Sequence, residues 1–259
     1  MILAIDVGNT NITLGTFNKS RLRRIFRVTT KTPRTSDEYG ILLTDIIRLS
    51  EASVSDIDGV IIASVVPSVM YSLVNGCSKY LHIRPLIVGP GMKTGVRVHS
   101  DNPKDTGADL IANAAAVKEI YGGPAIVVDY ETSTSYELVL EDGTLYSVIL
   151  TPGIQTSLTA LTSEASRIME VEIKKPRTKL PHETTECIQA GIVYGTIGET
   201  EYIVKMMKEE AGLGDIKVVA TGGFGRVIAK ETSVIDTFDP LLTLHGLRII
   251  YQKSRSEKA

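Results

Sequence analysis

The chain has 259 residues, of which 43% are hydrophobic and 22% charged, and its formal net charge is −2 at pH 7. This composition is ordinary for a globular protein with a sizeable core, and the length allows one large domain or two small ones. A slightly negative chain has no general attraction for nucleic acid or anionic lipid, so we expect no nucleic-acid partner and no membrane partner. The local basic cluster is interpreted as a solvated hairpin; it comprises Arg21, Arg23, Arg24 and Arg27.

The longest apolar runs have only the length of a strand, which predicts no membrane span. Asp6 interrupts the apolar N-terminus too early for a secretory signal. The two cysteines, Cys77 and Cys187, lie far apart and have no CxxC partner, so they predict neither a zinc site nor a disulfide. Unpaired thiols suit a reducing compartment, and we expect a cytoplasmic protein.

Hydrophobic periodicity in the first half predicts a strand at residues 2–7, a Gly-Asn-Thr-Asn turn and a second strand with alternating apolar residues. The following elements are predicted in chain order: a strand at 22–28, a helix at 37–49, a strand at 60–66, a helix at 67–81 and a strand at 85–88.

The second half repeats this order from a buried strand at 125–128. An offset of 123 residues lays Asp129 on Asp6, Thr132 on Asn9, Ser133 on Thr10 and Leu145 on Leu22. Later, the strand at 218–220 holds the place of residues 60–64. Two such copies indicate two similar α/β lobes rather than chance matches. We place the boundary inside the helix that follows Asp109, which predicts lobes at 1–117 and 118–259.

The turn Asp6-Val7-Gly8-Asn9-Thr10-Asn11 carries the first candidate chemistry. A carboxylate at the end of a strand can hold Mg²⁺, while Asn and Thr side chains bond phosphate oxygens and Gly8 lets the backbone approach an anion. The alternative is a hairpin in which Asp and Asn only cap the turn. No Walker A motif competes, because residues 89–94 lack its spacing, and no GxGxxG follows the first strand.

Two further segments have a structural and a functional interpretation. Thr106 and Asp109 are spaced to cap a helix at 108–120, and Asp109 is also placed to accept a proton from an attacking alcohol. The turn Thr221-Gly222-Gly223 is either a bend before a helix or a place where a purine and its ribose approach the backbone.

Taken together, these segments resemble the type III pantothenate kinases, of the acetate and sugar kinase/Hsp70/actin superfamily. The motifs that carry the resemblance span the whole chain; they are residues 6–11, 34–40, 63–67, 107–109, 221–223 and 239–247. The resemblance implies an α/β fold of two ribonuclease-H-like lobes, the actin-like ATPase fold, with a nucleotide cleft between them. It also implies phosphorylation of pantothenate by ATP, the first step of coenzyme A synthesis.

Carried over to this sequence, the resemblance implies a role for each site residue. Asp109 accepts the proton, Asp6 lies near Mg²⁺, and Asp129 holds a monovalent cation, K⁺ or NH4⁺. The residues implied in ATP binding are Asp6, Gly8, Asn9, Thr10, Asn11, Thr132, Gly222 and Gly223. Those implied in binding pantothenate are Gly107, Ala108, Asp109, Thr184, Ser100 and Leu110. The family also implies a dimer whose acceptor pocket is completed by the neighbouring subunit.

Three positions depart from the family pattern. The second phosphate turn of the family reads Asp-Phe-Gly-Thr-Ala-Thr, and here Glu131 replaces its glycine at the place of Gly8 in the repeat. A carboxylate beside nucleotide phosphates repels them, at a cost on the order of several kcal/mol in a partly desolvated cleft. Ser100 stands where the family has tyrosine, and Leu110 replaces an arginine suited to the carboxylate of pantothenate.

These departures leave three hypotheses. The first is an active pantothenate kinase, alone or within a complex, with Glu131 turned toward a cation. The second is an impaired paralogue that serves as regulatory or hetero-oligomeric subunit of an intact enzyme, using the helix at 184–210 as an interface. The third keeps the kinase chemistry with a less anionic alcohol. The apolar stripe of that helix, residues Ile188, Ile192, Gly195, Ile203 and Met206, is equally typical of ordinary core.

Overall fold

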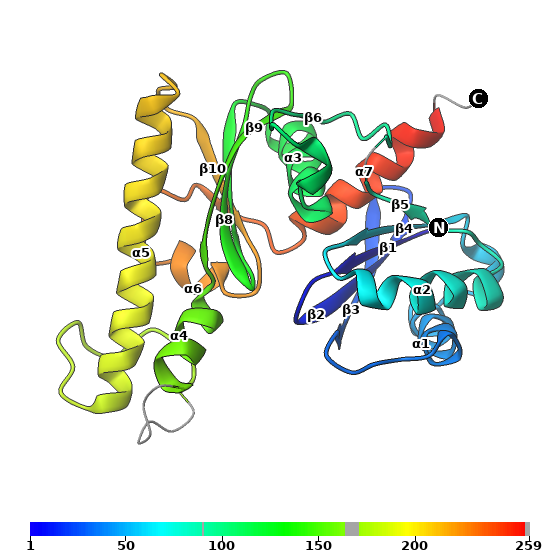
Figure 1. Cartoon of the computed structure of the whole chain (residues 1–259), viewed down its shortest axis with the longest axis horizontal. Helices are drawn as coiled ribbons and strands as arrows, with labels where there is room; N and C mark the ends of the chain where they lie inside the picture. The colour runs from blue at the N-terminus through cyan, green and yellow to red at the C-terminus, as the bar shows by residue number, and fades with distance from the viewer. Residues whose placement is uncertain (90, 164–170, 257–259) are drawn as a thin grey trace. The chain divides into compact units, whose positions relative to one another are not determined.

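The computed structural model describes residues 1–89, 91–163 and 171–256 (Figure 1). It divides into two compact units. The first unit holds Met1–Glu119 together with the segment that begins at Leu242, and the second unit holds Ile120–Leu241. Each unit has its own sheet and its own core.

The first unit is built on a five-stranded sheet in the order β3-β2-β1-β4-β5. Strands β1, β2 and β3 form an antiparallel meander, while β4 and β5 join parallel to β1. The strands of this sheet are β1 (Ile2–Val7), β2 (Asn11–Asn18), β3 (Arg21–Thr29), β4 (Gly59–Ser64) and β5 (Leu86–Ile87), and the short β6 (Arg97–Val98) lies outside it. The helices are α1 (Ser36–Leu49), α2 (Pro67–Gly76), α3 (Ala108–Tyr121) and α7 (Leu242–Ser256), with short helical turns at Val54–Asp56, Cys77–Leu81 and Pro103–Asp105.

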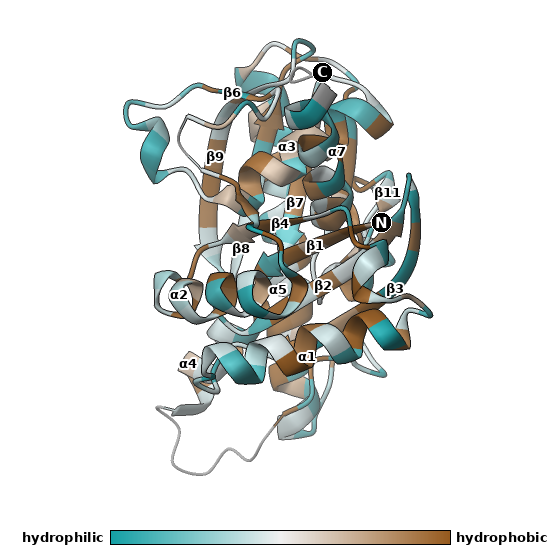
Figure 2. Cartoon of the chain, turned by 90° about the vertical axis from the view of Figure 1, so that its right-hand side faces the viewer, coloured by the Kyte–Doolittle hydropathy of each residue, from teal (hydrophilic) through white to brown (hydrophobic). Residues whose placement is uncertain are grey.

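Alternation along β1 gives this sheet two apolar faces. Leu3 and Ile5 pack in one core with side chains of α1 and α2. Ile2 and Ala4 point the other way and pack with α3 and α7. Because successive strand residues face opposite sides, a near-continuous apolar strand is covered on both faces. Figure 1 shows α1 and α2 on one side of the sheet and α7 on the other, and the strands β1 and β4 are strongly hydrophobic in Figure 2.

The second unit repeats this plan. Its strands follow the order β11-β10-β7-β8-β9, again an antiparallel meander with parallel additions. The strands are β7 (Ala125–Tyr130), β8 (Ser133–Val139), β9 (Thr144–Pro152), β10 (Lys217–Thr221) and β11 (Thr237–Phe238). The helices are α4 (Ile154–Ser163), α5 (Thr184–Glu210) and α6 (Gly225–Ala229). Figure 1 shows the long helix α5 running along one face of this sheet, where Val193, Ile203 and Val204 join the core.

The predicted internal repeat is confirmed by the strand register. Asp6 pairs with Ala63 of the parallel neighbour, and Asp129 pairs with Thr221. Each meander also carries a β-bulge at the same place, between Thr16 and Phe17 in β2 and between Leu138 and Val139 in β8. A bulge that recurs at an equivalent position is a conserved structural device rather than a chance irregularity.

The repeat differs from the predicted offset at one place. Asp6 pairs with Thr13 across the first meander, whereas Asp129 pairs with Ser135 across the second. The turn between β7 and β8 is therefore one residue shorter than the turn between β1 and β2. Ser133, which we expected to match Thr10, opens β8 as Asn11 opens β2.

Helix α7 belongs to a different unit from the one that the predicted lobe boundaries imply. We expected residues 118–259 to form one lobe, but α7 belongs to the first unit. Its residues Leu244, Leu247 and Ile250 are buried with Ala4 and Phe17. A single boundary along the sequence cannot describe this return of the chain to the first unit. The apolar stripe of a helix indicates a buried face, but not which sheet it packs against.

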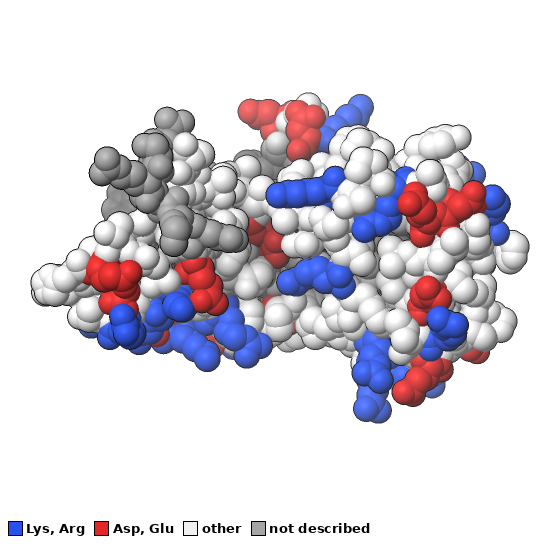
Figure 3. Space-filling model, turned by 90° about the horizontal axis from the view of Figure 1, so that it is seen from below, with Lys and Arg blue, Asp and Glu red and all other residues white. Residues whose placement is uncertain are grey.

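Within the three described ranges, no helix is long and apolar enough to cross a membrane. On the face seen in Figure 3, basic and acidic side chains lie close to one another. Ion pairs of the first unit include Arg48–Asp45 and Lys79–Asp37.

Candidate functional site

The first turn, residues 8–10, joins β1 to β2 and is held in place through its backbone. The amide of Gly8 donates to the carbonyl of Asn11 at 3.0 Å, and the hydroxyl of Thr30 donates to the carbonyl of Gly8 at 2.8 Å. The amide of Thr30 donates to the carbonyl of Thr10 at 3.0 Å. Asn9 and Thr10 are exposed, so their side chains are presented to solvent on a fixed loop.

Asp6 lies just before this turn, one residue from the end of β1, and is partly buried. A carboxylate in that place offers the hard oxygen ligand that Mg²⁺ prefers. Among the residues that the structure describes, no group of three or more His, Cys, Asp or Glu could hold a metal by itself. A magnesium ion at Asp6 would therefore need oxygens from a phosphate ligand and water, which is its usual coordination in nucleotide sites.

Asp109 is the second residue of helix α3, which begins at Ala108 as predicted. Its Oδ1 accepts a hydrogen bond from the amide of Leu110 at 2.9 Å, an amide of the first turn that has no partner within the helix. A Cβ atom at Gly107 would lie 2.3 Å from this oxygen, so a larger residue there would displace the carboxylate from its present position. Part of Asp109 is exposed, yet burial of the carboxyl group raises its pKa above the ordinary value of 3.8. A raised pKa makes the carboxylate a better proton acceptor, because catalytic bases work best with a pKa near the operating pH.

The two other residues of the first unit that are implied in binding the acceptor substrate, Ser100 and Leu110, have no cationic side chain. Ser100 is exposed, and its hydroxyl accepts from the amide of Asn102 at 3.3 Å. Leu110 follows Asp109 in the first turn of α3 and is partly buried. Neither side chain supplies the charged donor that a substrate carboxylate prefers.

In the second unit, the end of β7 packs directly against the glycine turn, residues 221–223. Asp129 is 8% exposed, and a Cβ atom at Gly222 would lie 2.6 Å from its Oδ1 and from the backbone of Tyr130. Gly222 also has φ = +86°, a conformation that other residues rarely adopt. The turn also leads into α6 at Gly225, which agrees with the interpretation of a bend before a helix, while the approach of a purine and its ribose stays a prediction.

Glu131 and Thr132 form the second turn, between β7 and β8. The amide of Glu131 donates to the carbonyl of Ser133 at 3.1 Å, as the amide of Gly8 does in the first turn, so Glu131 is the structural equivalent of Gly8. Its Oε1 accepts the amide of Gly223 at 3.0 Å. The carboxylate is therefore tied to the glycine turn, a contact that the sequence did not reveal.

Thr132 and Thr184 have different surroundings. The carbonyl of Thr132 accepts the amide of Gly153 at 3.1 Å and the hydroxyl of Thr156 at 2.7 Å, which fixes the second turn from behind. Thr184 is the first residue of α5 and is exposed. The structure thus brings Asp129 and the second turn together with the glycine turn, through the contacts of Gly222 with Asp129 and of Glu131 with Gly223.

A buried polar network behind the second turn escaped the sequence analysis. The hydroxyl of Thr200 lies 2.9 Å from that of Tyr130 and 3.2 Å from that of Tyr136, and Tyr136 also donates to Glu199 at 3.0 Å. Thr151 donates to the same carboxylate at 2.8 Å. Burial raises the pKa of both tyrosines, so their hydroxyls stay protonated donors. The sequence signal was the pair of polar residues on the face of α5 that packs on the sheet.

The predicted interface stripe of α5 is largely core. Ile192, Ile203 and Met206 pack in the hydrophobic core of the second unit, which favours the second of the two interpretations of that stripe. Other residues of the helix are exposed, including Tyr202 at 71%.

Comparisons with solved structures identify the class of fold. A conserved putative Baf family transcriptional activator from Campylobacter jejuni has a TM-score of 0.58 at 17% identity, covering 98% of this chain and 99% of its own. The ethanolamine utilization protein EutJ from Carboxydothermus hydrogenoformans has a TM-score of 0.58 at 14% identity, covering 96% and 89%. At these identities the likeness concerns the fold alone. Together with the repeated β-meander it defines a protein of two α/β units that share one plan.

Sequence comparisons then identify the family. The family model described as type III pantothenate kinase matches residues 2–206. A type III pantothenate kinase of Agathobacter rectalis is 51% identical over 98% of this chain and 97% of its own length. The chain belongs to the type III pantothenate kinase family.

Proposed function

We propose that this chain is a kinase that transfers the γ-phosphoryl group of ATP to pantothenate, giving 4′-phosphopantothenate, the first step of coenzyme A synthesis. The family membership and the identity of 51% to a type III pantothenate kinase support the reaction. The single structural observation that carries it is the carboxyl group of Asp109, whose pKa is raised by burial at the start of α3.

In the proposed reaction, Asp109 accepts the proton of the attacking pantothenate hydroxyl as the phosphoryl group is transferred. Phosphoryl transfer needs little covalent chemistry from the protein beyond positioning and charge stabilisation. The capping bond from the amide of Leu110 keeps the carboxylate oriented. Gly107 and Ala108 leave room for the substrate beside it, and Ser100 and Leu110 line the same pocket in this proposal.

ATP would be bound by turns of both units. In the first unit, Asn9 and Thr10 would bond phosphate oxygens, and Asp6 would hold Mg²⁺ together with those oxygens. In the second unit, Thr132 and the glycine turn would contact the nucleotide. The buried carboxylate of Asp129 suits a monovalent cation such as K⁺ or NH4⁺, because burial of a carboxylate favours a bound counter-charge.

Glu131 is proposed to weaken ATP binding without abolishing it. Its carboxylate is exposed and bonded to the amide of Gly223, so its charge is partly screened and partly compensated. The intact first turn and Asp109 favour a chain that is active by itself over the alternative of a non-catalytic subunit.

Assembly and location are also proposals. The family resemblance implies a dimer, either a homodimer or a hetero-oligomer with a paralogous subunit, in which the partner completes the acceptor pocket near Thr184. The exposed Leu180 and Tyr202 offer apolar surface for such contacts. Two free thiols, Cys77 and Cys187, agree with a reducing cytoplasm.

The acceptor is tested by supplying the purified chain with ATP, Mg²⁺ and one of several alcohols. Pantothenate, pantetheine and a neutral amide analogue of pantothenate form a series in which only the charged end changes. The proposal expects pantothenate to be the best acceptor by kcat/KM. Preference for the neutral analogue would instead establish the less anionic acceptor that Leu110 suggests.

A further inference from the structure

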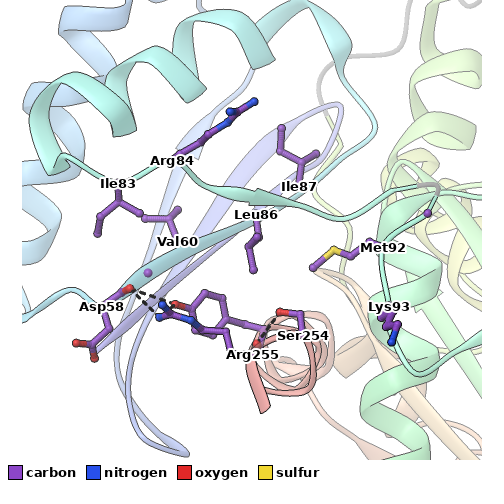
Figure 4. A pocket seen from close by; sticks show the side chains of 13 residues that line it. Asp58, Val60, Ile83, Arg84, Leu86, Ile87, Met92, Lys93, Ser254 and Arg255 are labelled. Atoms are coloured by element: carbon purple, nitrogen blue, oxygen red, sulfur yellow. Dashed lines mark hydrogen bonds between the residues drawn. The ribbon is translucent and has the colours of Figure 1, made fainter. Parts of the chain in front are cut away.

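A cavity of about 590 Å³ opens in the first unit, away from the first turn. It lies between the start of β4, the segment that leads into β5 and the last turns of α7 (Figure 4). Gly59 opens β4, whereas Ala63 pairs with Asp6 near the other end of that strand. Since a strand rises about 3.3 Å per residue, the cavity lies about 13 Å from the Asp6 end. It is a separate site from the proposed phosphate-binding turn.

Tyr251 of α7 builds one wall of this cavity. It is 6% exposed, and its hydroxyl donates to the carbonyl of Asp58 at 3.1 Å. A Cβ atom at Gly59 would lie 1.8 Å from that hydroxyl, so only glycine lets the ring enter here. Arg255 in turn donates to the Tyr251 hydroxyl at 2.8 Å, and its guanidinium lies 5.6 Å from the centre of the ring. The guanidinium is thus held in one place before any ligand arrives.

The positive charge of Arg255 is not neutralised by an ion pair within the part of the chain that the structure describes. Its hydrogen bonds run from one nitrogen, Nη1, to a carbonyl and a phenol, both uncharged. An arginine presents five N–H donors, so the Nε and Nη2 donors are left for a ligand. The carboxylate of Asp58, which also lines the cavity, pairs with the N-terminal ammonium of Met1.

The rest of the wall is mainly apolar. Val60, Leu86 and Met92 line the cavity, and Figure 4 shows Leu86 and Met92 on the side that faces α7. Ile87 and Arg84 stand at the rim, where Figure 4 shows them pointing away from the other side chains. The cavity therefore joins an apolar wall to a fixed and unneutralised cation.

We propose that this cavity binds a small organic anion that carries an apolar chain. The oxyanion head, a carboxylate or a phosphate, accepts the remaining N–H donors of Arg255 in the paired geometry that arginine favours. The chain lies against Leu86 and Met92 and leaves water. The volume is in the range of small-molecule sites, which are mostly apolar with a few polar groups that fix orientation.

Four probes test the proposal on the full-length chain by calorimetry, with the ¹³C-methyl NMR signal of Met92 as a local reporter. Octanoate and octyl phosphate carry both head and chain, octanol has only the chain, and inorganic phosphate has only the head. We expect saturable binding of at least one of the two anions, with a shift of the Met92 signal, and at least tenfold weaker binding of octanol and inorganic phosphate. The tighter of the two anions identifies the head that the site prefers.

Variants distinguish binding in this cavity from non-specific binding of the anion elsewhere on the chain. Arg255→Gln is expected to weaken the anion at least tenfold. Arg226→Gln, which removes an arginine stacked 5.4 Å from Phe238 in the second unit, should leave binding unchanged. Met92→Glu, placed in a loop, should abolish binding by repulsion and serves if Arg255→Gln does not fold. Octanol that binds as tightly as the preferred anion, no shift of the Met92 signal with either anion, or wild-type affinity in either Arg255→Gln or Met92→Glu would overturn the proposal.

Discussion

The carboxylate of Glu131 accepts a hydrogen bond from the amide of Gly223, 3.0 Å away. This bond joins the second turn to the glycine turn that ends β10, inside the unit where ATP is proposed to contact Thr132. The equivalent residue of the first turn is Gly8, which has no side chain to make such a bond. The two repeats therefore differ at this position. A nucleotide would meet a negative charge at Glu131 in the second turn and no charge at Gly8 in the first.

Replacing Glu131 by glycine is expected to strengthen ATP binding. The charge is exposed and hydrogen-bonded, so we expect the KM for ATP to fall about tenfold, or about 1.4 kcal/mol, rather than by the full cost of a buried charge. Glu131→Gln is the matched control, because it keeps an acceptor for Gly223 and removes only the charge. Steady-state kinetics at varied ATP measure both. A KM that rises in Glu131→Gly but not in Glu131→Gln would show that the bond positions the glycine turn instead.

Asp109→Asn is expected to lower kcat by about 10²- to 10⁴-fold, the usual contribution of a general base. Asparagine can still accept the amide of Leu110, so the helix should remain capped. In the wild type, the base form is lost as pH falls through a pKa that lies above 3.8. The pH profile of kcat should therefore show an acid limb above that value, and the limb should vanish in the variant. An unchanged kcat would remove Asp109 from the mechanism.

The same residue gives a stability prediction with a definite sign. Because burial raises the folded-state pKa of Asp109, its ionised form opposes folding at neutral pH. Asp109→Asn should thus unfold at a slightly higher temperature than wild type at pH 7. The difference should shrink as pH falls toward 3.8, where the unfolded carboxyl group also becomes protonated. Calorimetry at several pH values measures the difference in melting temperature between the variant and wild type. A variant with the lower melting temperature at pH 7 would contradict the burial of the Asp109 carboxyl group.

Gly222→Ala is expected to destabilise the second unit. Its φ of +86° costs about 1 kcal/mol for alanine, and the added Cβ atom would lie 2.6 Å from Asp129 and Tyr130. Gly122→Ala is the control, since Gly122 has φ = +81° with no atom within 4 Å of a Cβ. Denaturant titration should therefore give a clearly larger loss for Gly222→Ala. Equal losses would mean that the glycine turn does not press on the end of β7.

The buried network on α5 predicts a further cost. Thr200→Val leaves the hydroxyls of Tyr130 and Tyr136 without this partner, which should cost about 1–3 kcal/mol. Thr196→Val on the same helix removes only a bond to the carbonyl of Ile192 and should cost less. The free energy of unfolding of the two variants makes the comparison. Equal losses in the free energy of unfolding would show that the bonds to Tyr130 and Tyr136 add nothing beyond those of a threonine that bonds only to its own helix.

Much of the fold could be predicted from the sequence because apolar periodicity, turn residues and an internal repeat agree with one another. The acidic residues at the ends of β1 and β7 are equivalent, and the parallel neighbours β4 and β10 occupy the same place in their sheets. The return of α7 to the first sheet could not be predicted. The apolar residues Leu244 and Leu247 indicate that one face of the helix is buried, but not which sheet it packs against. The shorter second turn also escaped notice, because the turn after β8 is longer by one residue and restores the offset: Val139 pairs with Leu145, whereas Phe17 pairs with Leu22.

For the site, the sequence identified the turns and Asp109 but not their contacts. Glu131 was expected to face nucleotide phosphates, and the structure bonds it to Gly223. Its partner lies 92 residues further along the chain, and such a separation carries no periodic signal. The polar pair Glu199 and Thr200 was missed for a related reason, because its tyrosine partners lie on distant strands.

The most direct test of the central claim is the turnover of pantothenate by this chain alone, with ATP, Mg²⁺ and K⁺ and no other homologue present. The account predicts 4′-phosphopantothenate in amounts that exceed the enzyme many times over, detected by mass spectrometry, and none with Asp109→Asn. Product that forms only after an intact paralogue is added, or equally with Asp109→Asn, would contradict it.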